Sequence, residues 1–141
     1  MQWTTERRMR SVPDDVVSLL AEPEAWPSWV PGVEAVQVRD DDIRVTVMAA
    51  VPWELVVSAT TTTDGVDIDL VRGPLPDLSV RLHLTGTLAR CVLTFVPPAA
   101  VPAPLLRELE EVVMPRALAS LDAATEARQA VVRGRSARSD G

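Results

Sequence analysis

Residues 53–70 read WELVVSATTTTDGVDIDL, and this stretch decides the fold. Apolar side chains occupy alternate positions from Trp53 to Ala59, and they alternate with aspartates from Val66 to Leu70. A Thr-Asp-Gly sequence at 63–65 separates the two runs. A period of two is typical of strands with one buried and one wet face, and Asp-Gly favours a tight turn. The stretch is therefore predicted to form a β-hairpin.

The same alternation extends along the chain in both directions. Upstream, runs at 33–38 and 43–47 are joined by an acidic turn of three aspartates. Downstream, runs at 78–84 and 90–96 are joined near Gly86. Each connection is too short to hold a crossover helix, so neighbouring strands are expected to be antiparallel.

The N-terminal segment, from Gln2 to Ser11, is predicted to be a further strand, followed by two short helices. The first helix begins at Pro13, because proline and the acidic residues after it suit a first helical turn. The second passes through Trp26. Prolines on both sides of Trp29 then predict a tight connection in place of an extended element.

A long C-terminal helix is predicted from Ala103 to Val132. Its apolar residues recur at helical spacing and form one inner stripe. The stripe consists of Leu106, Leu109, Val113, Ala117, Leu121 and Ala124. Pro115 lies within this pattern and is expected to kink the helix, because proline removes a backbone hydrogen bond.

These elements together predict one α+β domain over residues 1–132. A curved antiparallel sheet of about seven strands would bury one face against the long helix, with the two short helices after the first strand. Residues 133–141, rich in Arg, Gly and Ser, are predicted to be a disordered tail.

The composition excludes several classes of protein. The 141 residues carry 20 acidic side chains against 14 arginines and no lysine, with a net charge of −6, which disfavours nucleic acids and anionic membranes. The apolar stretches are too short for membrane insertion, and the N-terminus lacks the apolar segment of a signal peptide. A cytoplasmic location is expected, in keeping with a single cysteine.

Two short motifs carry a resemblance to a known family. They are VPDDVV at 12–17 and WPSWVPGV at 26–33. Together with the order of strands and helices along nearly the whole chain, they resemble the START-like (SRPBCC) superfamily. The branch they resemble is the bacterial polyketide cyclase/dehydrase, or coenzyme Q-binding, branch. The resemblance implies a helix-grip fold, in which a curved sheet wraps the C-terminal helix and leaves an apolar cavity between them.

Four apolar residues are candidates for contact with a ligand in that cavity. Trp29 and Trp53 are amphipathic rings at element ends, where such rings often line pocket mouths. Plain core packing is the alternative for both. Leu109 and Val113 belong to the inner stripe of the long helix and would line the helix side of the cavity.

Two arginines are further candidates for ligand binding. Arg7 alternates with apolar neighbours and would grip a carboxylate or carbonyl oxygen with its planar guanidinium group. Alignment with the family motif would instead turn Arg8 and Arg10 inward, and a position at the rim is the alternative for Arg7. Arg72, at the end of a strand, carries the same ambiguity.

No catalytic residue is assigned. His83 and Arg81 lie on one strand face, where they would serve as acid, base or anion clamp, but their parity predicts that they point to solvent. Cys91 shares parity with apolar neighbours and is expected to be an inert buried thiol. The few metal-ligating side chains and the scattered glycines predict neither a metal site nor a cofactor.

Two hypotheses of function follow. The first is a carrier or sensor that binds a small hydrophobic molecule, such as a lipid, a quinone or a polyketide-like compound. The alternative is a polyketide cyclase or aromatase that folds a poly-carbonyl chain in the same cavity. Whether the protein is an enzyme is left open, and an exposed edge strand allows a homodimer.

Overall fold

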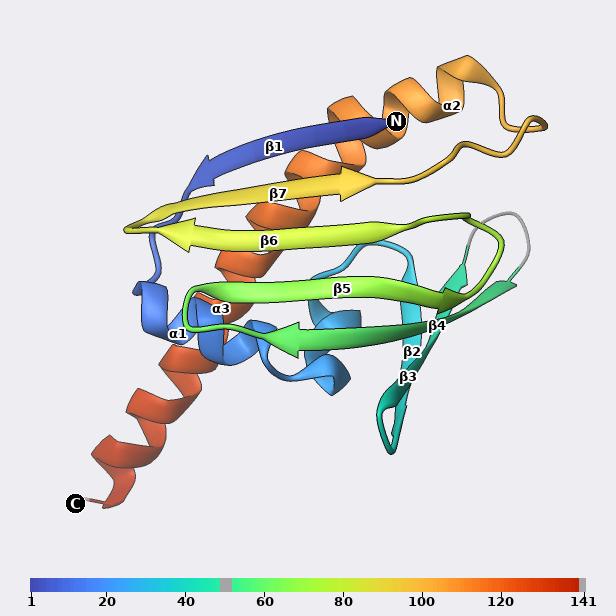
Figure 1. The fold of residues 1–141 in the computed structure, drawn as a ribbon. Helices are drawn as coiled ribbons and strands as arrows, with labels where there is room; N and C mark the ends of the chain where they lie inside the picture. Colours follow the sequence, from blue (N-terminus) through green and yellow to red (C-terminus); the bar gives the residue numbers. More distant parts are fainter. Residues whose placement is uncertain (49–51, 140–141) are drawn as a thin grey trace.

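The computed structural model describes residues 1–48 and 52–139, and a single seven-stranded antiparallel sheet forms its framework (Figure 1). The strand order is β1-β7-β6-β5-β4-β3-β2, so every hairpin joins sequence neighbours and β1 closes onto β7. The strands are β1 (Gln2–Arg8), β2 (Val33–Arg39), β3 (Asp42–Met48), β4 (Pro52–Thr61), β5 (Gly65–Arg72), β6 (Ser79–Thr85) and β7 (Leu88–Thr94). The predicted antiparallel sheet is confirmed.

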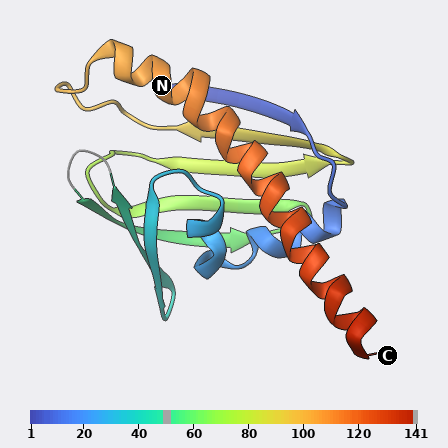
Figure 2. The ribbon, with the colours of Figure 1, turned by 180° about the vertical axis from the view of Figure 1, so that it is seen from behind.

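The helices cover one face of this sheet (Figure 2). They are α1 (Pro13–Leu20), the 3-10 helix η1 (Pro23–Ser28), α2 (Ala103–Glu108), the π-helix η2 (Leu109–Val113) and α3 (Met114–Ser139). The last three form the continuous C-terminal helix, which crosses the sheet diagonally. The sheet wrapped on a long helix confirms the predicted fold class.

The end of the C-terminal helix differs from the prediction. The helix continues through the predicted end at Val132 to Ser139, so the backbone at 133–139 is helical and not irregular. Residues 140–141 of the predicted tail lie outside the described residues. The assignment of 133–141 to a segment outside the domain stays a prediction.

The core lies between the helices and the inner face of the sheet. Directly opposed residues of neighbouring strands point to the same face, and the registers Val66↔Leu82 and Leu84↔Ala89 place apolar side chains inward. The main cluster consists of Met9, Val16, Leu19, Leu20, Trp26, Trp29, Ile43, Val45, Leu55, Val57, Val66, Leu82, Leu84, Ala89, Leu118 and Leu121. A second cluster packs Trp3 against Phe95 edge to face, with ring centroids 4.9 Å apart, and includes Met114.

Pro115 changes the helix in a way that the sequence pattern did not anticipate. Its ring crowds the carbonyl of the preceding turn, and the backbone just before it widens into the π-helix η2. Two α-helical turns take about seven residues and would place Val113 above Leu106. The wider turn uses an extra residue, so Met114 shares the second cluster with Leu106.

The predicted inner stripe is therefore wrong in its middle part. Leu109 is 37% exposed, and Val113 is only partly buried. Met114 and Leu118 take the inner positions instead, and Leu121 keeps the position predicted for it.

Two local irregularities shape the sheet. The pairing of β2 with β3 shifts between Val33 and Ala35, and that of β4 with β5 shifts between Val56 and Val57. At the start of β5, a Cβ on Gly65 would collide with the carbonyl oxygen of Leu82. Only glycine permits this close approach of the backbones.

Candidate functional site

A hollow of about 270 Å³ opens between the η1–β2 connection and α3. Prolines fix the backbone of this connection, and Gly32 has a positive φ of 84° that completes its turn into β2. The hollow is lined by Pro27, Ser28, Trp29, Val30, Pro31, Gly32, Val33, Arg116 and Ser120. The predicted tight, aromatic-bearing connection is confirmed, and it forms one wall of a site.

Trp29 is the predicted ligand-binding residue that lines this hollow. It is 6% exposed and belongs to the main core, as the core-packing alternative expects, and a ligand contact at this residue stays a prediction. Its indole Nε1 is buried without a hydrogen-bond partner, as is that of Trp26. A buried indole N–H usually has a partner, so each of these two donors carries a desolvation cost that an acceptor would relieve.

Arg116 and Ser120 form the helix side of the hollow, one turn apart on α3. Arg116 is exposed, and in the part of the chain that the structure describes it makes no ion pair. The hydroxyl of Ser28, on the facing wall, donates to the carbonyl of Ala25. The hollow thus combines apolar walls with one positive charge.

The space directly between the sheet and α3 is filled by side chains. Leu118 and Leu121 belong to the same packed cluster as Leu82 and Leu84 of β6. The implied apolar cavity is therefore not an open chamber at this position. The hollow beside Trp29 lies at the margin of this packed region.

A buried carboxylate joins α3 to the end of β1. Asp122 is 2% exposed and accepts hydrogen bonds from the backbone N–H groups of Arg10 and Ser11 and from the Ser11 hydroxyl, at 2.8–3.2 Å. Burial acts to raise the pKa of Asp122, but these hydrogen bonds and the charge of Arg7 outweigh it and lower the pKa below its usual value.

Arg7 faces α3, so of the two frames that the sequence left open for this strand, the observed one turns Arg7 inward and leaves Arg8 and Arg10 exposed. Its Nε lies 3.7 Å from an Asp122 oxygen, which is an ion pair without a hydrogen bond. The side chain of Arg8 instead bonds Thr87 on an exposed surface, and Arg10 is exposed. Arg7 is thus held by Asp122 and lines neither of the two hollows that are described.

The remaining predicted ligand contacts lie apart from the hollow. Trp53 is half-buried at the start of β4 opposite Val47, and Arg72 is exposed at the end of β5. Leu109 and Val113 lie in the π-helical segment, before Arg116. Among the predicted contacts, the structure brings only Trp29 to the hollow; a ligand role for the others stays a prediction.

A second hollow, of about 370 Å³, lies where α1 begins beside α3. It is lined by Arg10, Ser11, Val12, Asp15, Glu126, Gln129 and Arg133. The negative charges of its two acidic side chains equal in number the positive charges of its two arginines. The Asp122 oxygens and the Ser11 hydroxyl beside it are already engaged in hydrogen bonds.

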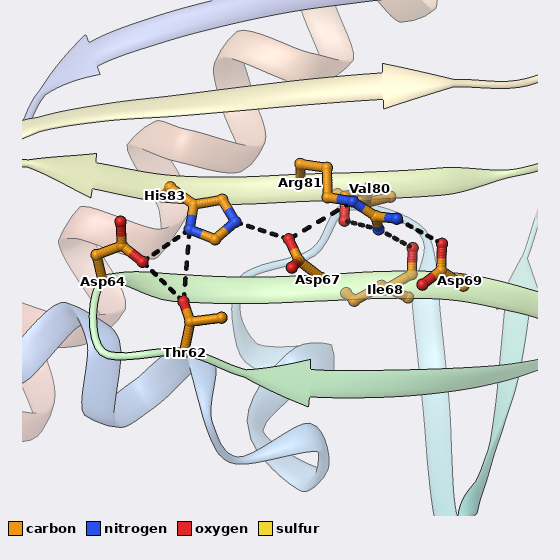
Figure 3. A network of polar contacts seen from close by, with 8 residues as sticks. All are labelled: Thr62, Asp64, Asp67, Ile68, Asp69, Val80, Arg81 and His83. Carbon is orange, nitrogen blue, oxygen red and sulfur yellow. Dashed lines mark hydrogen bonds and ion pairs between the residues drawn. The ribbon is translucent and has the colours of Figure 1, made fainter.

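His83 and Arg81 lie on the outer face of the sheet, away from the helices (Figure 3). The two ring nitrogens of His83 lie 2.9 Å from Asp64 and 2.7 Å from Asp67, and Arg81 pairs with Asp69 at 2.8 Å. Burial acts to lower the pKa of His83, but Asp67 and Asp64 outweigh it and raise the pKa. This network bridges β5 and β6. His83 and Arg81 are both engaged by aspartates within it, so it is explained as a structural feature of the sheet.

Other reactive groups are sparse. Burial raises the pKa of the Cys91 thiol to about 11, which leaves it protonated near neutrality. Within residues 1–48 and 52–139, no group of three or more His, Cys, Asp or Glu side chains is placed to hold a metal ion. In the same residues, no helix is both long and apolar enough to cross a membrane.

Arg116, Ser120 and Asp122 were not identified as site residues from the sequence. Arg116 and Ser120 are polar residues one turn apart on a helix, which is the usual pattern of a solvated helix face. Asp122 lies one turn after Leu118 on the buried face of the helix, but Leu118 was not part of the predicted stripe, so the sequence pattern held no signal for Asp122. Its partners at the end of β1 are distant in sequence and follow only from the fold.

Comparison with known proteins identifies the fold. No protein-family model and no curated protein matches the chain. A START superfamily protein from Mycobacterium smegmatis superposes with a TM-score of 0.69 and 16% identity, over 89% of this chain and 96% of that one. The Zhui aromatase/cyclase from Streptomyces sp. R1128 superposes with a TM-score of 0.59 and 20% identity, over 91% and 93% of the chains. The di-domain ARO/CYC StfQ of the steffimycin biosynthetic pathway superposes with a TM-score of 0.65 and 15% identity, over 92% of this chain and 51% of StfQ. The chain therefore has the START-like helix-grip fold.

Proposed function

We propose that the protein binds a small hydrophobic molecule, such as a lipid, a quinone or a polyketide-like compound, at the hollow beside Trp29. The apolar part of the ligand packs against Trp29, Val30 and Val33. The observation that carries this proposal is the hollow itself, which is lined by Trp29, a residue whose buried indole Nε1 has no hydrogen-bond partner among the described residues. A ligand oxygen that reaches this N–H would relieve a desolvation cost of about 1–3 kcal/mol.

The START-like fold supports a small-molecule site near the C-terminal helix, although the family resemblance implies a cavity between the sheet and this helix, and the hollow lies at the margin of that packed space. Small-molecule sites are typically concave and mostly apolar, with a few placed polar groups. The hollow shares part of this character: it is shallow and open to solvent, with apolar residues on the η1–β2 connection and the polar Arg116 and Ser120 on α3.

The alternative function is that of a polyketide cyclase or aromatase. Two similar structures, Zhui and StfQ, are described as aromatase/cyclases, which favours this alternative. Such a reaction needs a titratable group beside the ligand to assist enolisation and dehydration. In the described residues Asp122 is the buried carboxylate, and it is engaged by Arg10, Ser11 and Arg7. Binding without catalysis is therefore the function that the geometry favours.

Native mass spectrometry of the purified protein, followed by solvent extraction, tests the proposal. We expect a co-purifying small molecule whose occupancy falls in Trp29→Phe and is unchanged in Trp3→Phe. Trp3 is a matched control, because it is equally buried but packs against Phe95 in the second cluster. Equal occupancy in both variants would place the ligand elsewhere. A purified protein that is empty and that also fails to bind added hydrophobic probes would contradict the proposal.

A further inference from the structure

The charge of the hollow beside Trp29 narrows the class of ligand. Arg116 is the one charged residue among those that line it. The larger hollow at the start of α1 provides a contrast, because Asp15 and Glu126 line it together with Arg10 and Arg133. Of these two hollows, only the one beside Trp29 has an unbalanced positive charge.

This positive charge contrasts with the acidic composition of the chain as a whole. The protein has 20 acidic residues against 14 arginines, yet no carboxylate lines the hollow among the residues that the structure describes. Arg7 lies 3.7 Å from Asp122 and Arg128 lies 2.7 Å from Glu22, whereas the exposed Arg107 on α2 makes no ion pair within the described residues. Arg116 has no such partner in the described part of the chain.

From this geometry we infer that the ligand is a hydrophobic monocarboxylic acid, whose carboxylate binds Arg116 while its apolar body packs against Trp29. The inference rests on the proposed function. A guanidinium group presents its N–H donors in a fixed fork that matches a carboxylate, and the pairing can be bidentate. Ser120, one turn further along α3, adds a hydroxyl donor to the same wall. A single arginine balances a single negative charge, which favours a monoanion over a phosphate.

The size of the hollow agrees with a compact acid. Its volume of about 270 Å³ is close to the lower end of the range for small-molecule sites, roughly 300–1,000 Å³. A bicyclic aromatic acid or a short-chain acid matches this volume better than a long lipid does.

A pair of isosteric probes tests the inference. 2-Naphthoate and 2-naphthamide have the same ring and nearly the same shape, but only the first is charged at neutral pH. The protein has 4 tryptophans, so their indole N–H signals can be followed by nitrogen-proton NMR, with Trp29→Phe to assign the relevant signal. We expect the Trp29 signal to shift with both probes and the naphthoate to bind about tenfold more tightly.

Variants of arginine separate the inference from the proposed function. In Arg116→Gln the preference for naphthoate should be lost while the affinity for naphthamide is kept. Arg107→Gln, an exposed arginine on α2 that does not line the hollow, is the matched control and should keep the preference. Equal binding of the two probes, unaffected by Arg116→Gln but weakened by Trp29→Phe, would overturn the carboxylate inference alone. If neither probe shifts the Trp29 signal, the proposed function at this hollow fails as well.

Discussion

The two sides of α3 differ in how their polar groups are satisfied. Toward β1, Asp122 is buried, and its oxygens accept hydrogen bonds from Arg10 and Ser11. Toward the η1–β2 connection, Arg116 has no acidic partner among the described residues and the indole N–H of Trp29 has no acceptor. On the first side the carboxylate oxygens are engaged within the chain, although the Arg7 Nε beside them makes no hydrogen bond; on the second side the donors lack an acceptor among the described residues.

This difference separates structural polar residues from residues available to a ligand. A buried polar group whose hydrogen bonds are all made within the protein stabilises one arrangement of the chain. A donor without a partner lowers stability and gains from an external acceptor. Burial alone does not distinguish them, because Asp122 and Trp29 are both nearly inaccessible.

The largest effect is expected from removal of the Asp122 carboxylate. Asp122→Ala leaves the Ser11 hydroxyl, two backbone N–H groups and the charge of Arg7 without their partner, and should lower the free energy of unfolding by about 3 kcal/mol or more. Urea denaturation measures this loss. Glu126→Ala, one turn later and exposed, should change stability by less than about 0.5 kcal/mol. If Asp122→Ala lowered the free energy of unfolding by as little as Glu126→Ala, the Asp122 cluster would not be stabilising.

The same carboxylate should also set part of the acid sensitivity. Its pKa is lowered in the folded state, so its contribution is complete above the unfolded value of about 3.9. That contribution is lost as the pH falls through the folded pKa. The isosteric Asp122→Asn variant should therefore show a flatter decline of stability below about pH 4 than the unmodified protein.

An intermediate effect should distinguish the observed helix register from the one that the sequence pattern predicts. Met114 is 8% exposed in the second cluster, whereas Val113 is only partly buried. Met114→Ala should cost about 2 kcal/mol and Val113→Ala less than about 1 kcal/mol, measured by urea denaturation. The reverse order would show that the helix has no extra residue before Pro115 and that Val113 faces the core.

The smallest effect is expected at the network of His83 and Arg81 on the outer face of the sheet. Its charged groups are paired, but they are largely exposed. The pKa of His83 is raised in the folded state, so its stabilisation is complete below the unfolded pKa of about 6.5 and is lost as the pH rises through the folded value. His83→Gln should lower stability by less than about 1 kcal/mol near pH 6 and by almost nothing near pH 9. Thermal unfolding at the two pH values measures this. In an Asp67→Asn background the effect near pH 6 should shrink; an unchanged effect would exclude Asp67 as its source.

The strands were predictable because their signal is local. Alternation in β4 and β5 and the Thr-Asp-Gly turn define a hairpin without any distant contact. The π-helical turn was not predictable from the sequence. A single extra residue before Pro115 moves the inner position from Val113 to Met114, and both residues are apolar, so the pattern does not show the shift. Pro115 by itself predicted a kink in the helix but no change in which residues face the core.

The site was predictable only where the chain is constrained locally. Prolines on both sides of Trp29 predicted the tight, aromatic-bearing connection that forms one wall of the hollow. Arg116 and Asp122 are charges on one helix, and the sequence pattern does not tell which of them has a partner. That depends on β1 and on the η1–β2 connection, which lie far from α3 in the sequence.

The shifted register in β2 bears on how the protein avoids joining other sheets. As an edge strand, β2 presents backbone groups that could pair with another chain. The irregular pairing between Val33 and Ala35 interrupts the regular ladder there, and the strand carries exposed Glu34 and Arg39. Bulges and charges of this kind discourage edge-to-edge association. We therefore expect the irregularity beside the hollow to limit association through this edge as well.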